Sequence, residues 1–378
     1  MKQISDVLVI GSGIIGAATV YALTRAGVRR VSLIEKGPLV SGMTRRNAGL
    51  VHPFHAHPLT ITLAEASYPF YQQWAFHLGN SKTGFVETGA AVVAETDMEA
   101  DALRGEFFML AQQSTDISQI EGNSLASLFP GVASNFRGAL FTPRAGYADA
   151  VQTAQAMVNK AKEGGLQVHT GTQVKQIVAE RGQIRGVVTT TGTFETPTVI
   201  VAAGGWAERL LAPFGVSLRL QFRRGVVMFY ELPPELAQAH PMLLDPSGNF
   251  FLRPHPYRMS AVGTVFPEIH PNGVDSLDDN IAPSETSRIA QFAADCIPAF
   301  THAQSKRAHS VLYDSPLDGL PALGRVQNAE GLFVAAGFGT SAFAVAPAVG
   351  QTLAQIVLDG SAGLDVSPFS PSRASLRR

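Results

Sequence analysis

The chain has 378 residues, of which 46% are hydrophobic and 16% charged, and its formal net charge is −1. The length predicts about two domains, and the composition is typical of a globular protein with a large apolar core. The near-neutral charge gives no reason to expect nucleic acid or an anionic membrane as a partner. A single cysteine, Cys296, excludes an intramolecular disulfide and a redox-active dithiol, and fits a reducing compartment.

The start of the chain gives no indication of a leader segment. Residues 1–13, MKQISDVLVIGSG, lack the basic first segment of a signal peptide and reach glycines after a short apolar run. We find no run of about 18 apolar residues, so no membrane span is expected. We therefore expect a cytoplasmic protein.

The first elements form a dinucleotide-binding pattern. Asp6–Ile10 (DVLVI) predicts a short buried strand, GSGIIG follows, a helix is expected from Ile14 to about Arg25, and Val31–Ile34 predicts a second strand. The strand, turn, helix and strand are in the order that a βαβ unit requires. The pattern predicts dinucleotide binding, but by itself it does not separate NAD from FAD.

Each motif position has a physical role. Gly11 permits the tight turn, Gly13 lets the backbone approach a pyrophosphate, and Gly16 lets the helix pack on the strand. The helix N-terminus at Ile14 and Ile15 supplies free N–H groups for the phosphates. Glu35, followed by Lys36, ends the second strand, where a carboxylate can accept both adenosine ribose hydroxyls.

Three later segments favour FAD over NAD, beginning with an irregular loop. SGMTRRNAG, residues 41–49, follows Glu35 almost at once, where a simple NAD dehydrogenase would continue with regular βα units. Its small residues let the backbone press against a ligand. Arg45, Arg46 and Asn47 offer donors to phosphate or ring oxygens.

The second segment is TVIVAAGGW, residues 198–206. Thr198–Ala202 predicts a buried strand that ends in Ala203-Gly204-Gly205, where chain and ligand can approach closely. The preceding residues 171–197 alternate apolar and polar side chains around turn glycines, as in a β-meander. A meander inserted before a later strand of the same sheet is not simple Rossmann topology.

The third segment is residues 331–360. Leu332–Ala336 predicts a strand, GFGTSA follows, and a helix is expected from about Ala346 to Leu358, with Pro347 at its start and Gly360 just past its end. GFGTSA also fits a second G-x-G-x-x-A fingerprint, but too little chain follows for another βαβ unit. The better interpretation is a helix N-terminus aimed at a flavin's pyrimidine edge, where negative charge develops on reduction.

Together these motifs resemble the FAD-dependent amino-acid and amine oxidoreductases of the D-amino-acid-oxidase superfamily, which include glycine oxidase, sarcosine oxidases and D-amino-acid dehydrogenases. The resemblance covers nearly the full length through VIGSGIIG, SGMTRRNAG, VIVAAGGW, DGLPALG and GLFVAAGFGTSAFAVAPAVG. It implies an α/β Rossmann-like, discontinuous FAD-binding domain (1–85, 146–215 and 305–378) with an inserted α+β, antiparallel-sheet substrate domain (86–145 and 216–304).

The resemblance also implies which residues hold FAD. Gly11, Gly13, Gly16 and Glu35 would meet its adenosine and pyrophosphate half, and Val174 would meet the adenine through its backbone. The central phosphates and the flavin would lie against the loop and the later glycine motifs, at Ser41, Thr44, Arg45, Arg46, Asn47, Ala48, Gly49, Leu50, Ala203, Gly204, Gly337, Gly339, Thr340 and Ser341.

The late motif departs from that of many members. They place an arginine that grips a substrate carboxylate where HSVLYDSPLDGLPALG has Tyr313, and the Y-D-x-x-P form looks more like sarcosine oxidase β subunits and dimethylglycine-dehydrogenase-like enzymes. Arg253 is the substitute candidate, with Tyr257 and Tyr313 as hydroxyl donors. Ser310 and Val311 stand where members with covalent flavin often carry a cysteine, so noncovalent FAD is expected, with attachment through a histidine left open.

The histidines of LVHPFHAHP invite a metal-site hypothesis. His52, His55 and His57 do not share one helix face, and no cysteine or nearby carboxylate completes a ligand set, so no metal is expected. They are interpreted as pocket lining. For His52, a substrate or proton contact and plain packing stay open.

The resulting expectation is an enzyme that oxidises the C–N bond of an amino acid or secondary amine by hydride transfer to flavin N5, without an obligatory side-chain base. Ala261 falls where some oxidases place an oxygen-activating lysine, which favours a dehydrogenase. Two alternatives stay open. One is a flavin-binding subunit that relays electrons within a hetero-oligomer, and the other is an NAD-dependent dehydrogenase. Homo-oligomers are equally compatible with the sequence.

Overall fold

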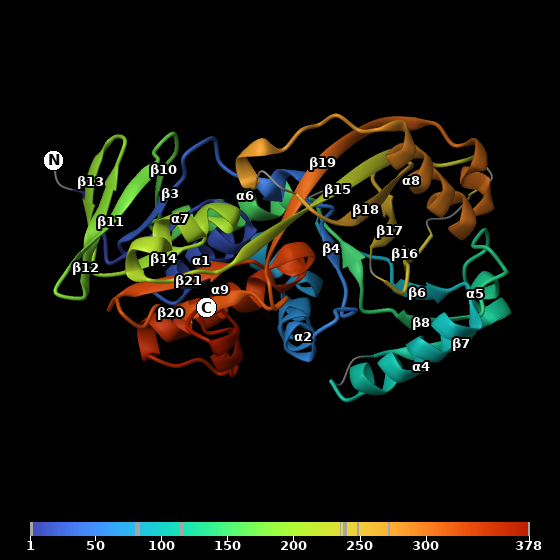
Figure 1. The fold of residues 1–378 in the computed structure, drawn as a ribbon, viewed down its shortest axis with the longest axis horizontal. Helices are drawn as coiled ribbons and strands as arrows, with labels where there is room; N and C mark the ends of the chain where they lie inside the picture. Colours follow the sequence, from blue (N-terminus) through green and yellow to red (C-terminus); the bar gives the residue numbers. More distant parts are fainter. Residues whose placement is uncertain are drawn as a thin grey trace.

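Two large β-sheets of different construction organise the chain (Figure 1). The computed structural model describes residues 3–79, 84–113, 116–234, 236, 240–247, 249–270 and 273–376. One sheet is built mainly from parallel strands and the other mainly from antiparallel strands, as the α/β plus α+β expectation requires.

The first sheet has six strands in the order β10-β3-β2-β14-β21-β20. Its strands are β10 (Gln167–His169), β3 (Val31–Ile34), β2 (Val7–Ile10), β14 (Val199–Val201), β21 (Leu332–Ala336) and β20 (Ala322–Arg325), all parallel except β20. Every residue of β2, β3, β14 and β21 is buried, because helices cover one face and a smaller sheet covers the other.

Three helices pack on one face of this sheet: α1 (Ile14–Arg25), α6 (Ala150–Glu163) and α9 (Ala342–Asp359). On the other face lies a four-stranded sheet of β1 (Gln3–Ile4), β13 (Gly192–Glu195), β12 (Gln183–Thr189) and β11 (Val174–Glu180). Strands β11 to β13 form the predicted meander, and β14 returns beside β2 in the main sheet. The short helix α7 (Ala207–Leu211) follows β14.

The predicted start of the last helix is wrong. Helix α9 begins at Ala342, after the 3-10 turn η6 (Gly339–Ser341), so that Pro347 lies inside it. Proline lacks the N–H that would bond the Phe343 carbonyl. The Tyr71 hydroxyl donates to that carbonyl instead, and Ser67 Oγ accepts the Ala348 N–H at 3.0 Å. Both partners come from α2 (Pro58–Gln72), so tertiary contacts carry the helix past its proline.

Residues 339–359 are long and apolar enough to cross a membrane by length and composition alone. In this structure most of that stretch is buried inside the protein, where α9 packs against α1 and α2. Its apolar character is explained by its place in the core of the first sheet.

The second sheet has eight strands in the order β19-β15-β18-β17-β16-β6-β8-β7. Its strands are β19 (Ser305–Pro316), β15 (Leu220–Glu231), β18 (Met259–Ile269), β17 (Phe250–His255), β16 (Met242–Leu244), β6 (Ala90–Ala94), β8 (Gly138–Thr142) and β7 (Ser118–Glu121), antiparallel except where β16 meets β6. Helices α4 (Asp97–Ala111), α5 (Gly122–Leu128) and α8 (Pro283–Cys296) flank it.

Three short strands connect the two parts: β4 (Leu50–Val51), β9 (Gly146–Tyr147) and β5 (Val86–Glu87), with α3 (Trp74–Leu78) nearby in sequence. The long strands β15 and β19 run side by side from the second sheet toward the first (Figure 1). Strand β19 is thus a full member of the antiparallel sheet, whereas the expected domain division gives residues 305–378 to the FAD-binding part. The division itself stays a prediction.

Arg224 connects the second sheet to a flanking helix. Strand β15 is an interior strand, and the Arg224 guanidinium pairs with Glu285 of α8 while donating to Ser310 Oγ at 2.8 Å. Both side chains of the ion pair are largely buried. Arg224 therefore ties α8 to the sheet.

Candidate active site

A cavity of about 560 Å³ opens at the carboxyl ends of β2, β3, β14 and β21. We call it the glycine-lined cavity, because Gly11, Gly13, Gly204, Gly337 and Gly339 all line it. The carboxyl end of a parallel sheet is where ligands bind in open α/β folds. The backbone turns that leave these strands therefore form most of its wall.

The tight turn after β2 tolerates no side chain. Gly11 has φ +103°, and a Cβ there would lie 2.5 Å from the Ala202 carbonyl oxygen. A Cβ on Gly16 would lie 1.9 Å from the Gly11 carbonyl oxygen. No side chain caps the first turn of α1 at Gly13, although Thr44 Oγ1 accepts the Ile14 N–H at 2.9 Å. The helix thus presents its positive end to the cavity.

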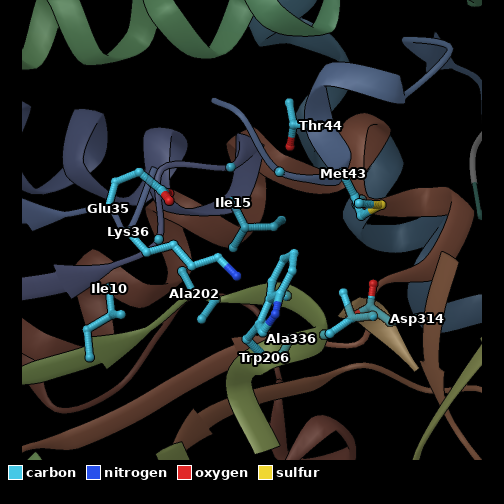
Figure 2. Close-up of a pocket in the computed structure, with 18 of the residues that line it drawn as sticks. Ile10, Ile15, Glu35, Lys36, Met43, Thr44, Ala202, Trp206, Asp314 and Ala336 are labelled. Atoms are coloured by element: carbon cyan, nitrogen blue, oxygen red, sulfur yellow. The ribbon is translucent and has the colours of Figure 1, made fainter. Parts of the chain in front are cut away.

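Glu35 is held rigidly at one end of the cavity. Its Oε2 accepts hydrogen bonds from Ser12 N at 2.9 Å and Ser12 Oγ at 2.8 Å, and its Oε1 accepts one from Gly37 N at 3.0 Å. Lys36 lies beside it with its Nζ 3.4 Å from the centre of the Trp206 ring (Figure 2). Burial lowers the pKa of Lys36. Trp206 Nε1 donates to Asp275 at 2.7 Å, which fixes the ring.

The opposite end is formed by β19 and the turn before α9. Tyr313 and Asp314 of β19 line the cavity, as do Gly337 and Gly339. Figure 2 shows Asp314 among the lining side chains. Burial raises the pKa of Tyr313. Asp314 Oδ2 is buried and has no hydrogen-bond partner among the described residues. Burial raises the pKa of this carboxyl to about 6, although backbone hydrogen bonds from Asp314 and Gly337 act in the opposite direction.

The structure brings many predicted FAD-binding residues to this one cavity. Those that line it are Gly11, Gly13, Ile14, Ile15, Glu35, Lys36, Ser41, Thr44, Asn47, Val174, Ala203, Gly204, Gly337 and Gly339. Gly16 lies behind the wall against Gly11, and Ser341 turns its hydroxyl to the Phe338 carbonyl at 2.7 Å. Also absent from the lining are Arg45, Arg46, Ala48, Gly49, Leu50 and Thr340.

The loop after β3 faces two ways. Arg46, expected to reach phosphate or ring oxygens, instead pairs with Asp279 and donates to the Ser310 carbonyl at 2.9 Å. The Arg46 carbonyl lies 3.1 Å from His309 Nε2. Asn47 Oδ1 accepts a hydrogen bond from the Gly49 N–H at 2.7 Å, within the same turn. The arginines of this loop therefore face a neighbouring space.

That space is a second cavity of about 600 Å³, which we call the arginine-lined cavity after Arg45, Arg46, Arg253 and Arg307. It shares the lining residues Ser41 and Asn47 with the glycine-lined cavity. Volumes of this size are typical of small-molecule sites. The remaining wall comes from the second sheet and from residues around β9.

Arg253 lies in this wall with 4% of its surface exposed. Its Nε donates to the Ala48 carbonyl at 2.8 Å, and one terminal nitrogen donates to the Pro254 carbonyl at 2.6 Å. The guanidinium also lies 4.4 Å from the centre of the Tyr147 ring. Burial lowers its pKa to about 10, so the charge is retained at neutral pH. Arg253 thereby holds the loop against the second sheet.

His52 lines neither cavity, and Tyr257 lines the arginine-lined cavity only at its exposed rim. His52 stacks on His55 at 4.9 Å between ring centres and is not among the residues that line either cavity. Burial lowers its pKa well below the ordinary value. Tyr257 is 90% exposed at the rim of the arginine-lined cavity. Within the part of the chain that the structure describes, no group of three metal-ligating side chains forms.

Several cavity residues were not predicted from the sequence: Trp206, His255, Arg307, His309 and Asp314. Three of them stand on β19, where Arg307 and His309 share a face with Val311 and Tyr313 by the period-two alternation of a strand. That alternation in KRAHSVLYD was a usable signal. The predicted roles considered Tyr313 alone.

Comparison with known proteins identifies the family. The chain matches the FAD dependent oxidoreductase family over residues 6–356. The chain belongs to this family. Its cofactor is FAD, and it is an oxidoreductase; an NAD-dependent dehydrogenase is thereby set aside.

Three relatives illustrate the range within the FAD-dependent oxidoreductases. Glycine oxidase of Geobacillus kaustophilus is 27% identical over 377 residues, covering 97% of each chain, and the solved structure of glycine oxidase from that organism aligns with a TM-score of 0.88 at 26% identity over 98% of this chain and 99% of that one. Monomeric sarcosine oxidase of Bacillus sp. is 25% identical, over 98% of this chain and 97% of the relative. The structure of L-proline dehydrogenase from P. horikoshii has a TM-score of 0.90 at 23% identity over 98% of each chain, which is a likeness of fold.

The glycine-lined cavity fits FAD on its own geometry. The uncapped start of α1 suits an anionic pyrophosphate, and the Glu35 carboxylate beside it suits ribose hydroxyls. A Cβ on Gly11 or Gly337 would meet neighbouring atoms at 2.5 Å in both cases, so the wall requires glycine there. At the other end, the unpartnered Asp314 Oδ2 atom and the turn before α9 offer polar groups to a flavin ring.

Proposed function

We propose that this protein oxidises the C–N bond of an amino acid or of a secondary, N-substituted amine. The substrate would lose a hydride from the carbon and a proton from the nitrogen, and the resulting imine would take up one water to give a carbonyl compound and an amine or ammonia. FAD supplies the hydride acceptor when bound. The protein's part is to bind the substrate, orient it and keep its amine neutral.

The observation that carries this proposal is the junction of the two cavities. Strand β19 lines both, with Arg307 and His309 in the arginine-lined cavity and Val311 and Tyr313 in the glycine-lined cavity. A substrate at this junction would lie between the flavin end of one cavity and the cationic wall of the other. Guanidinium groups are the usual partners of carboxylates, which favours a substrate with an acid group.

Three side chains, Tyr313, Arg253 and His255, would surround the substrate. The Tyr313 hydroxyl is available as a donor at the flavin end, and burial keeps it protonated because its pKa is raised. Arg253 would meet a carboxylate through the part of its guanidinium not used by the Ala48 and Pro254 carbonyls. His255 has a pKa of about 4, lowered by burial and by Arg253 and Arg307, so it is neutral at physiological pH. A neutral imidazole at this position would not donate a proton to the substrate amine.

Anaerobic flavin bleaching tests the proposal. The purified holoprotein is mixed without oxygen with D- and L-amino acids, N-alkylglycines and proline, and the flavin absorbance is followed. Bleaching by at least one class, with release of the matching carbonyl compound, supports the proposal. If every compound leaves the flavin oxidised while dithionite reduces it, the proposal fails and an electron-relay subunit becomes the better account.

The electron acceptor is part of the same proposal. Ala261 is fully buried in β18 and pairs with Phe229 and Arg253, so no lysine stands at this point of the sheet. We infer a dehydrogenase that uses an acceptor other than oxygen. Mixing the bleached protein with air-saturated buffer tests this: slow reoxidation is expected, and reoxidation as fast as turnover would identify an oxidase.

A further inference from the structure

The charged side chains of the arginine-lined cavity are unbalanced. Four guanidiniums, from Arg45, Arg46, Arg253 and Arg307, face two carboxylates, from Asp149 and Asp279, which leaves a formal excess of two positive charges. Both carboxylates are already engaged, since Asp279 pairs with Arg46 and Asp149 caps α6 by accepting the Gln152 N–H at 2.8 Å.

Among the described residues, the guanidiniums of Arg45 and Arg307 form no hydrogen bond or ion pair, and of the two only Arg307 lies over an aromatic ring. It lies 3.9 Å from the centre of the Phe229 ring. The same Phe229 ring lies 4.9 Å from the His255 ring and 5.8 Å from the His309 ring, measured between ring centres. Phe229 therefore orients a cation in the cavity while its donors stay available.

Arg253 provides a second, separate position. Arg253 is buried, donates a hydrogen bond to the Ala48 carbonyl and contacts the Tyr147 ring, whereas Arg307 is exposed. In the sheet, Arg253 belongs to β17 and Arg307 to β19, with β18 and β15 between them. One carboxylate would neutralise at most one of the two excess charges.

From these observations we infer that the cavity recognises a second acid group on the substrate, held by Arg307, and that the preferred substrates are N-substituted amino acids whose nitrogen arm ends in a carboxylate. This inference rests on the proposed function and names its substrate class. A cationic, partly enclosed wall attracts such a dianion and disfavours amines that carry an extra positive charge.

A matched substrate ladder tests the inference. N-Ethyl-, N-propyl- and N-butylglycine are compared with N-(carboxymethyl)-, N-(2-carboxyethyl)- and N-(3-carboxypropyl)glycine as reductants of the flavin under anaerobic conditions. For at least one arm length, the carboxylate is expected to raise kcat/KM by roughly tenfold, in the range of a charge-assisted hydrogen bond. Equal values at every arm length would overturn the inference and leave the proposed function standing.

Arg307→Gln identifies the group responsible. It should raise KM by roughly tenfold more for the carboxyalkyl substrates than for the N-alkylglycines, because only the former carry the carboxylate that Arg307 would hold. Arg288→Gln is the matched control, since Arg288 also lies near aromatic rings, Phe250 and Phe266, but outside both cavities. If Arg307→Gln affects both substrate series equally, or if Arg288→Gln has the same effect, Arg307 does not bind the second carboxylate. If no amine in either series bleaches the flavin, the proposed function itself fails.

Discussion

The walls of the two cavities differ, because one is formed mainly by backbone turns and the other by long side chains. The wall of the glycine-lined cavity consists largely of backbone turns at strand ends, and side chains are excluded from it where a Cβ would strike a carbonyl. The arginine-lined cavity is formed by long side chains that project from a sheet and a loop. Backbone cavities fix one ligand shape, whereas side-chain cavities change with single substitutions. Under the proposed function, cofactor binding and substrate choice would thus be separated within one molecule.

The largest effect is expected from Gly11→Ala. The added Cβ would lie 2.5 Å from the Ala202 carbonyl oxygen at φ +103°, so the turn must move, at a cost of about 3 kcal/mol or more. We expect purified protein without bound flavin and with reduced thermal stability. The control is Gly27→Ala, at φ +90° with open space around it, which should cost roughly 1–2 kcal/mol and retain FAD. Equal flavin content in the two variants would contradict a backbone-built cofactor site.

The second-largest effect is expected from Arg253→Met, as a loss of folding stability. This substitution leaves the Ala48 and Pro254 carbonyls without the Arg253 donors, and a buried unsatisfied group costs about 1–3 kcal/mol, so a loss of at least about 2 kcal/mol is expected. Urea unfolding of the holoprotein measures the loss. Arg258→Met, at an exposed turn, should change stability by less than about 0.5 kcal/mol. A neutral Arg253→Met would mean that this arginine serves the substrate alone.

Asp314→Asn tests the flavin end through pH. In the folded protein the pKa of Asp314 is about 6, above its ordinary value of 3.8, because burial disfavours the charged form. The contribution of the protonated Asp314 carboxyl to the free energy of unfolding is therefore fully present below about pH 4 and is lost as the pH rises through about 6. Both proteins are compared without flavin. The free energy of unfolding of Asp314→Asn should exceed that of the parent by up to about 3 kcal/mol at pH 8 and equal it at pH 4. A pH-independent difference in urea unfolding would contradict a titrating carboxyl.

The smallest effect is expected for Tyr313→Phe. Loss of one donor to a substrate should slow anaerobic flavin reduction by about twofold to tenfold, since one neutral hydrogen bond is worth about 0.5–1.5 kcal/mol. Stopped-flow bleaching provides the rate, and flavin content should not change. Complete loss of reduction with FAD still bound would indicate an obligatory base at this position.

The glycine motifs could be predicted from sequence because their spacing encodes backbone geometry directly. Val31–Ile34 and Leu332–Ala336 form the predicted strands with the predicted bounds, and Gly11 and Gly337 line one cavity. Contacts between distant side chains were not predictable. Arg253 could be singled out, but its partner Ala48 lies 205 residues away in sequence. Pro347 lies inside α9 because Tyr71 and Ser67 of another helix replace the hydrogen bonds it removes, and no local pattern carries that information.

Strand β19 imposes a constraint on how this site can diversify. Since alternate residues of a strand face opposite ways, inserting or deleting one residue between Arg307 and Tyr313 would turn one set of side chains out of its cavity. The strand is also paired with β15 over nearly its whole length, so such a shift would have to be absorbed by both strands. New substrate preferences should therefore arise by exchanging side chains along β19, while the length of this strand stays fixed.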